Sequence, residues 1–144
     1  MRRTISKSPE ETKKIAGEIA SSLQPGDVIA LFGELGSGKT TFVQGMTKEL
    51  GIKDRIISPT FLIIREHKLK TTNPKLKTLF HVDLYRIDRR DFRNLGLQEI
   101  FSDKQSLVVI EWAEKIEDLL PEKRIDIHFK YISENERALE INEK

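Results

Sequence analysis

A glycine-rich loop restricts the possible folds of this chain more than any other part of its sequence. Residues 33–40 read Gly-Glu-Leu-Gly-Ser-Gly-Lys-Thr and match the pattern G-x-x-x-x-G-K-[ST] at every fixed position. This pattern binds phosphate when it follows a buried strand and opens a helix, so it predicts a strand–loop–helix unit. The residues predicted to bind the phosphates are Gly33, Glu34, Leu35, Gly36, Ser37, Gly38, Lys39, Thr40 and Thr41.

The residues on either side of this loop have the required character. Val28–Phe32 is a continuous apolar run, which is typical of a strand buried on both faces in a parallel sheet. A helix is predicted from about Lys39 to Leu50, where Gly51 ends it. The start of that helix directs backbone N–H groups and the positive end of the helix dipole toward the loop. The whole segment therefore favours a bound anion.

We expect particular side chains to contact a bound triphosphate and its metal ion. Lys39 reaches the β- and γ-phosphates, and the Thr40 hydroxyl is a ligand for Mg²⁺. The metal also requires a carboxylate, usually at the end of a neighbouring apolar strand. Asp83 and Glu111 each end such a strand candidate, and the carboxyl ends of strands face the ligand crevice in sheets of this type. Two roles stay open for Asp83: it orients an attacking water, or it supports the site structurally.

Five other residues are candidates for the site, and two of them have an alternative structural interpretation. Thr60 either senses the γ-phosphate or Mg²⁺, as a switch segment does, or only opens a strand. Trp112 is either a half-buried packing residue or a neighbour of the nucleotide or of a partner. Tyr85 and Arg86 are the remaining aromatic and polar candidates. His81 lies on the same strand face as Asp83 and is interpreted as an orienting hydrogen-bond group.

The pattern over the whole chain predicts an α/β fold. We expect one P-loop NTPase domain over residues 1–144, with a mixed, mostly parallel sheet flanked by helices and an antiparallel C-terminal hairpin. An N-terminal helix is predicted to begin at Ser8, with Pro9 and Glu11 as its capping signals. The other predicted elements are strands at 61–64, 78–84 and 107–110, a last strand through 139 and 141, a helix at 91–101 interrupted at Gly96, a helix at 112–119, and a loop at 65–77. Residues 125–131 are predicted to form a half-exposed strand, in which Asp126, His128 and Lys130 alternate with apolar residues.

Composition excludes several classes of protein. The chain has no cysteine, so disulfides, thiolate metal sites and cysteine nucleophiles are excluded. No apolar run approaches the ~18–20 residues of a membrane span, and we expect a cytoplasmic protein that does not bind membranes. The 25 basic and 23 acidic residues give a net charge of +2, which does not by itself indicate a nucleic-acid partner.

Three functional alternatives stay open on these residues alone. A small-molecule kinase for a nucleoside or nucleotide is one, and a nucleotide-gated interaction module without useful turnover is another. A GTPase is disfavoured, because no Asn-Lys-x-Asp guanine motif is present. The third alternative is direct RNA contact by the loop at 65–77, but this loop lacks the interleaved aromatic residues that stack on bases, so a solvated loop is favoured. Its basic residues are Arg65, Lys68, Lys70, Lys75 and Lys77.

Four sequence blocks occur in a recognisable order. They are Gly-Glu-Leu-Gly-Ser-Gly-Lys-Thr-Thr at 33–41, Ser-Pro-Thr-Phe at 58–61, His-Val-Asp-Leu-Tyr-Arg at 81–86 and Glu-Trp-Ala-Glu-Lys at 111–115. Together they resemble the bacterial TsaE (YjeE) family of P-loop ATPases of tRNA threonylcarbamoyladenosine synthesis. Two departures stand out. Ala113 replaces a frequent proline. Glu136-Arg137 replaces a frequent Gly-Arg, which weakens the case that Arg137 lines a base pocket.

The resemblance implies a single α/β domain that binds ATP and Mg²⁺ and hydrolyses ATP slowly alone. It implies partner subunits of the TsaD and TsaB type, which form threonylcarbamoyladenosine in tRNA, so that tRNA is contacted indirectly through the complex. ATP hydrolysis then supports repeated turnover of the partners. The residues that the resemblance implies are Lys39, Asp83 and Glu111 for catalysis, Thr40 and Glu111 for the metal, and Thr60, Tyr85, Arg86 and Trp112 for switching or partner coupling.

Overall fold

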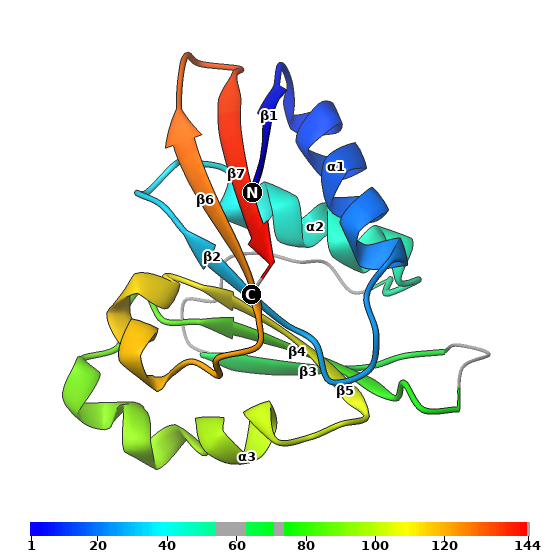
Figure 1. Cartoon of the computed structure of the whole chain (residues 1–144), viewed down its shortest axis with the longest axis vertical. Helices are drawn as coiled ribbons and strands as arrows, with labels where there is room; N and C mark the ends of the chain where they lie inside the picture. The colour runs from blue at the N-terminus through cyan, green and yellow to red at the C-terminus, as the bar shows by residue number, and fades with distance from the viewer. Residues whose placement is uncertain (54–62, 71–73, 144) are drawn as a thin grey trace.

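The computed structural model describes residues 1–53, 63–70 and 74–143, and its strands form one sheet in the order β1-β7-β6-β2-β5-β4-β3 (Figure 1). The strands are β1 (Arg2–Ser6), β2 (Val28–Phe32), β3 (Ile64–Lys68), β4 (Thr78–Asp83), β5 (Ser106–Glu111), β6 (Ile125–Tyr131) and β7 (Arg137–Glu143). The helices are α1 (Pro9–Ser21), α2 (Lys39–Glu49) and α3 (Leu97–Phe101), with 3₁₀ helices η1 (Arg89–Leu95) and η2 (Ala113–Leu119).

The centre of the sheet is parallel and both of its edges are antiparallel. Strand β2 pairs parallel with β5 and β6, and β4 pairs parallel with β5. At one edge β7 pairs antiparallel with β6 and with β1, and at the other edge β3 pairs antiparallel with β4. The predicted α/β class, the mixed sheet and the antiparallel C-terminal hairpin are therefore confirmed.

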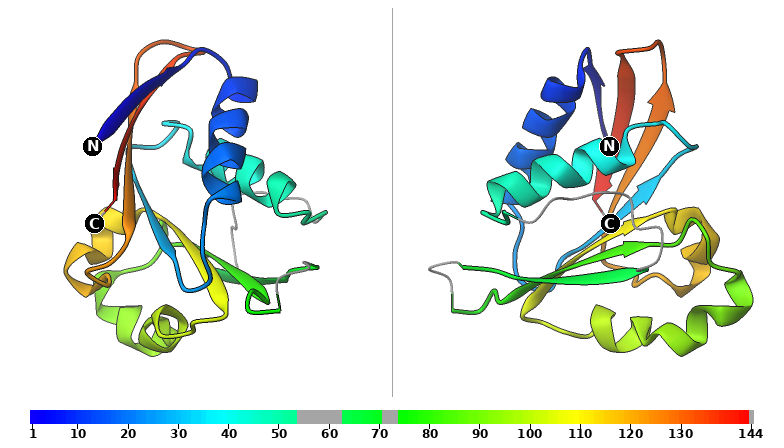
Figure 2. Two further views of the ribbon diagram at one scale, coloured as in Figure 1. Left: turned by 45° about the vertical axis from the view of Figure 1, so that its right-hand side comes forward. Right: turned by 180° about the vertical axis from the view of Figure 1, so that it is seen from behind.

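Helices cover the two faces of the sheet separately (Figure 2). Helices α1 and α2 pack on one face, where Ile29 and Leu31 of β2 join their core. The segments η1, α3 and η2 pack on the other face, where Val28, Ala30 and Phe32 of the same strand are buried. Because β2 is covered on both sides, every residue of the strand must be apolar, which explains its continuous run.

The predicted capping of α1 is also confirmed. The Ser8 hydroxyl accepts a hydrogen bond of 3.1 Å from the backbone N–H of Glu11, and Pro9 occupies the first turn of the helix. The helix break predicted at Gly96 is present, since Gly96 adopts a φ of 72° between η1 and α3. The described residues contain no helix that is long and apolar enough to cross a membrane.

The structure differs from the local predictions at three places. Strand β1 was not predicted. Strand β3 occupies the first part of the region predicted to be a loop at 65–77, and the strand predicted at 61–64 reaches the described residues only at its end, where Ile64 begins β3. Asp126 was expected on the exposed side of β6, but it is 3% exposed. Its Oδ1 accepts a hydrogen bond of 2.8 Å from Arg124 Nε, which compensates for the burial of the carboxylate.

Candidate functional site

The P-loop, residues 33–40, connects β2 to α2 at the carboxyl end of the parallel strands. Its backbone requires glycine at two positions in particular. Gly33 has a φ of 150°, and a Cβ there would lie 2.7 Å from Ser37 Oγ and 3.0 Å from the Phe129 carbonyl oxygen. Gly38 adopts a φ of 106° at the N-cap of α2. The loop therefore turns tightly into the start of the helix, as the sequence pattern predicted.

The Lys39 ammonium lies at the centre of the site. Lys39 is only 4% exposed, its Nζ donates a hydrogen bond to the Gly33 carbonyl oxygen, and the same nitrogen lies 3.4 Å from the centroid of the Trp112 ring. Burial lowers the pKa of Lys39, while the charges of Glu114, Glu111 and Asp83 oppose that shift. A cation held this way has little water to lose when it binds an anion.

Thr40, Glu111 and His81 form a continuous hydrogen-bonded chain across the sheet. The Thr40 hydroxyl donates a hydrogen bond of 2.9 Å to Oε1 of Glu111, and the other carboxylate oxygen, Oε2, lies 2.6 Å from Nε2 of His81. Glu111 is 2% exposed and His81 is fully buried. The structure thus brings both predicted metal-binding residues together, and it makes His81 a hydrogen-bond partner as predicted.

Asp83 lies at the end of β4, directly beside Glu111 of β5 in the parallel register. It is 5% exposed, and its Oδ1 accepts a hydrogen bond of 3.0 Å from the backbone N–H of Tyr85. This bond holds the carboxylate at the turn that leaves β4. Both candidate carboxylates therefore end neighbouring strands on the side of the sheet that carries α2.

Two aromatic rings form one wall of the site. The rings of Tyr85 and Trp112 have centroids 5.0 Å apart, and Trp112 adopts a left-handed backbone conformation with φ 63° and ψ 39°. Lys115 donates hydrogen bonds of 2.6 Å to the Tyr85 carbonyl oxygen and 3.3 Å to that of Ile87. Lys115 thereby ties the segment after β4 to η2. A left-handed backbone conformation is strained for a bulky residue, and such strained residues cluster at functional sites.

A cleft of about 310 Å³ lies between the P-loop and this aromatic wall. Clefts of larger volume, about 620 and 640 Å³, lie elsewhere: the first is at the opposite ends of the strands and the second is beside α1 and α2. We assign the site to the smaller cleft because the P-loop, the buried lysine and the carboxylate converge there. It is lined by Leu35, Gly36, Ser37, Gly38, Lys39, Thr40, Thr41, Tyr85, Arg86, Glu111, Trp112 and Arg137.

The structure adds two residues that sequence reasoning did not place at the site. Glu114 accepts a hydrogen bond of 3.1 Å from the backbone N–H of Gly33. Arg137 donates a hydrogen bond of 3.1 Å to the Gly36 carbonyl oxygen, and its guanidinium carbon lies 4.6 Å from the centroid of the Tyr131 ring. Glu114 belongs to the quoted block at 111–115, which was a signal for it. The signal for Arg137 was weaker, because glutamate precedes it where the family often has glycine, yet Arg137 lines the cleft.

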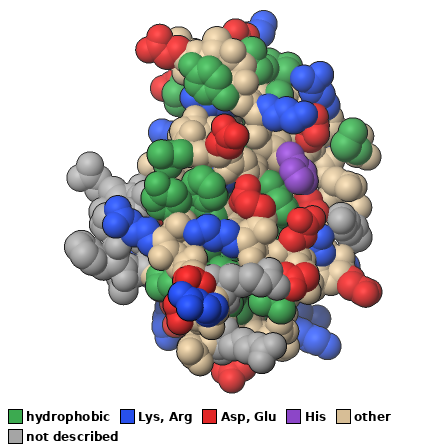
Figure 3. Space-filling view, turned by 90° about the vertical axis from the view of Figure 1, so that its left-hand side faces the viewer, with side chains coloured by type: hydrophobic (Ala, Val, Ile, Leu, Met, Phe, Trp, Pro, Cys, Tyr) green, Lys and Arg blue, Asp and Glu red, His purple; other side chains and the backbone are tan. Residues whose placement is uncertain are grey.

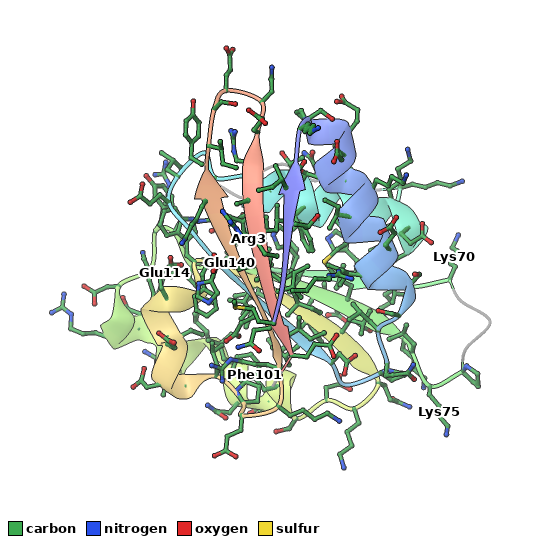
Figure 4. All side chains as sticks on the ribbon, turned by 45° about the horizontal axis from the view of Figure 1, so that its top comes forward. Arg3, Lys70, Lys75, Phe101, Glu114 and Glu140 are labelled. Atoms are coloured by element: carbon green, nitrogen blue, oxygen red, sulfur yellow. The ribbon has the colours of Figure 1, made fainter. Side chains whose placement is uncertain are left out.

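Two predicted features lie apart from the cleft or outside the described residues. Thr60 lies outside the described residues. The basic side chains of Lys70 and Lys75 lie at the far end of the molecule from Glu114 (Figure 4). Figure 3 shows acidic, basic and hydrophobic side chains interspersed over the described part of another face. The two lysines of the predicted basic loop therefore lie apart from the cleft, and RNA contact by this loop stays a prediction.

Comparisons with known proteins give a consistent result. The family model of the Threonylcarbamoyl adenosine biosynthesis protein TsaE matches residues 6–139. The tRNA threonylcarbamoyladenosine biosynthesis protein TsaE of Bacillus subtilis is 42% identical over 137 residues, which cover 95% of this chain and 81% of that protein. The protein of the same name from Treponema pallidum is 32% identical over 140 residues, covering 96% of this chain and 98% of its own length.

The same similarity is present in three dimensions. The crystal structure of Bacillus subtilis YdiB matches this fold with a TM-score of 0.77 at 38% sequence identity. The match covers 96% of this chain and 82% of that chain. Sequence and fold therefore agree over nearly the whole length of the molecule.

Proposed function

The chain belongs to the TsaE family of tRNA threonylcarbamoyladenosine biosynthesis proteins, and from this premise we propose that it binds and hydrolyses ATP with Mg²⁺ at the P-loop cleft. It acts as the ATPase subunit of the complex that forms threonylcarbamoyladenosine in tRNA. Its partners are subunits of the TsaD and TsaB type, and tRNA is reached through them. We propose a cytoplasmic location for this complex. Slow hydrolysis by the isolated subunit becomes useful when it is coupled to turnover of the partners.

The geometry of the P-loop is the observation that supports ATP binding. Left-handed glycines turn the chain into the start of α2, and the buried Lys39 ammonium lies beside them. Within the described part of the chain, the buried Ser37 hydroxyl has no hydrogen-bond partner. Buried hydroxyls normally have one, so this group suits a phosphate oxygen. The loop thus offers backbone amides, a hydroxyl and an ammonium to a single anion.

The residues around Thr40 also fit Mg²⁺. Its hydroxyl oxygen and Oε1 of Glu111 lie 2.9 Å apart. Two oxygens at adjacent octahedral positions, each 2.0–2.1 Å from Mg²⁺, are separated by about the same distance. No cluster of three or more acidic, histidine or cysteine side chains suited to a metal occurs among the described residues. Mg²⁺ fits this pattern, because it usually takes one or two protein ligands together with substrate phosphates and water.

Each residue of the cleft has a distinct part in hydrolysis. When bound, Mg²⁺ supplies positive charge to the outer phosphate oxygens and fixes their orientation. Lys39 donates to those phosphates, and the start of α2 directs its N–H groups at them. Asp83 is our candidate for orienting the attacking water, because its carboxylate is buried beside Glu111 and fixed by the Tyr85 N–H. Phosphoryl transfer to water depends mainly on this positioning and charge compensation.

Reconstitution tests the proposal. The chain is mixed with TsaD-type and TsaB-type subunits, tRNA and ATP, and repeated formation of modified tRNA is compared between wild type and Lys39→Ala. We expect multiple turnovers with wild type only, together with release of free phosphate. Transfer of labelled γ-phosphate to a small acceptor supports the kinase alternative instead. Full turnover when hydrolysis is blocked supports a nucleotide-gated module.

A further inference from the structure

The two oxygens of the Glu111 carboxylate have different partners. Oε1 accepts the hydrogen bond from the Thr40 hydroxyl at 2.9 Å, and Oε2 lies 2.6 Å from Nε2 of His81. Both Glu111 and His81 are almost completely buried, so water does not compete for either oxygen. The imidazole therefore determines which carboxylate oxygen is left toward Thr40.

The sheet register explains why His81 reaches Glu111. Asp83 stands opposite Glu111 in the parallel pair of β4 and β5, and His81 stands opposite Val109. Residues two apart on a strand share a face, so His81, Asp83 and Glu111 all point toward the side that carries α2. His81 thus lies two residues further from the carboxyl edge of the sheet than Asp83, on the same face, and its side chain supports that of Glu111.

Packing alone does not account for a histidine at this position. Among the described residues, the buried Nδ1 atom of His81 has no hydrogen-bond partner. A buried polar atom without a partner costs about 1–3 kcal/mol. An apolar side chain of similar size avoids that cost, so the gain from His81 must come from its bond to Glu111.

We propose that His81 is a positioning residue that makes the cleft prefer Mg²⁺ over Ca²⁺, an inference that rests on the proposed ATP and Mg²⁺ site. Ca²⁺ takes six to eight oxygen ligands at 2.3–2.6 Å and often binds a carboxylate through both oxygens. Mg²⁺ requires six ligands at 2.0–2.1 Å in near-ideal octahedral geometry. Because His81 occupies Oε2, Glu111 offers only Oε1, which suits Mg²⁺ and denies Ca²⁺ the bidentate arrangement.

Calorimetric titration of ATP in the presence of either Mg²⁺ or Ca²⁺ tests this role. His81→Phe removes the nitrogen but keeps a buried ring, and His81→Gln places an amide nitrogen near the position of Nε2. Residues that support a metal ligand typically contribute about 10–100-fold in metal affinity, so we expect His81→Phe to lower the Mg²⁺-supported affinity for ATP by about tenfold. Ca²⁺-supported binding should fall less or rise, while His81→Gln should keep most of the wild-type preference.

A matched control and a second variant pair make the result unambiguous. His67→Phe removes another buried histidine, on β3, and should leave the ratio of Mg²⁺-supported to Ca²⁺-supported affinity unchanged. If His81→Phe shows no cooperative thermal unfolding, the comparison passes to His81→Gln and His81→Asn. The asparagine amide is one carbon short of Nε2 and should lose the preference that glutamine keeps.

The outcomes separate this inference from the proposed function. An unchanged Mg²⁺-to-Ca²⁺ ratio in His81→Phe, an equal loss with both ions, or identical behaviour of the glutamine and asparagine variants overturns the role of His81. These results leave ATP binding by the wild-type protein intact. Failure of wild type to bind ATP with either ion, or full binding by Lys39→Ala, instead overturns the proposed function.

Discussion

Substitution of Gly45 by alanine should destabilise the contact between α1 and α2. A Cβ atom at Gly45 would lie 2.4 Å from the carbonyl oxygen of Lys13, 2.6 Å from Lys13 Cα and 2.9 Å from Ala16 Cβ. Two of these three atoms belong to the backbone, so no side-chain rotation relieves the contact. The two helices must move apart, and α2 carries Lys39 and Thr40 of the P-loop at its start.

The expected size of the effect follows from two opposing contributions. Overpacking a close interface costs typically 1–3 kcal/mol, and a clash with backbone belongs at about the upper end of that range. Replacing glycine by alanine within a helix gains about 1 kcal/mol of helix propensity. We therefore expect Gly45→Ala to lower the free energy of unfolding by about 1–2 kcal/mol.

Gly17→Ala is the matched control on the facing helix. A Cβ at Gly17 would meet its nearest atom, Glu49 Oε2, at 3.6 Å, which is ordinary contact. The same propensity gain should therefore raise its stability by up to about 1 kcal/mol. Urea unfolding of both variants and wild type, analysed with a common slope, measures the difference. A Gly45→Ala protein as stable as Gly17→Ala would refute the close approach of the two helices.

Three further predictions concern the site. Burial lowers the pKa of Lys39 from 10.5, so the wild-type protein gains stability as the pH rises from that lowered pKa toward 10.5. Lys39→Met should be more stable than wild type in urea unfolding, and this advantage should shrink over the same pH range. An advantage that grows with pH contradicts the prediction. Trp112 is the only tryptophan in the chain and its ring centroid lies 3.4 Å from Lys39 Nζ, so saturating ATP with Mg²⁺ should change its fluorescence in wild type, and unchanged emission counts against this contact. Lys115→Met removes the charged hydrogen bond to the Tyr85 carbonyl oxygen and should cost about 1 kcal/mol, seen as a Tm lower by about 3 °C; an unaltered Tm shows that the bond does not hold the segment.

Local sequence signals predicted the centre of the molecule well. The apolar run of β2, the P-loop and the start of α2 are consecutive in sequence, and each has a strong signature of its own. The position of Glu111 at the end of a strand was predicted correctly, because β5 is a second strand that is buried on both faces. These features depend on residue type at neighbouring positions, which is the information that one sequence carries.

The edges of the sheet were harder to predict for a physical reason. Strands β1 and β3 lie at the two edges, so only part of each is buried and their sequences keep many charged residues. His67 is the only residue of β3 that is buried, which leaves no clear alternation to detect. The sequence of such an edge strand resembles that of a loop, and only the pairing with its neighbour identifies it as a strand.

Long-range contacts at the site were also beyond sequence reasoning. Arg137 reaches the Gly36 carbonyl oxygen from a strand 101 residues away in the chain, and Glu114 reaches the Gly33 N–H over 81 residues. Such contacts depend on the order of strands in the sheet. Strand order follows from packing over the whole fold and has no local signature.

Calorimetric titration of ATP with Mg²⁺ into wild type and Lys39→Ala tests most directly whether the P-loop holds the triphosphate. A hydrogen bond to a charged group contributes about 1.5–3 kcal/mol, so loss of the ammonium should weaken ATP binding by at least about tenfold. We expect saturable binding by wild type with one nucleotide per chain and this loss in the variant. Equal affinity in both proteins would contradict the assignment of the site.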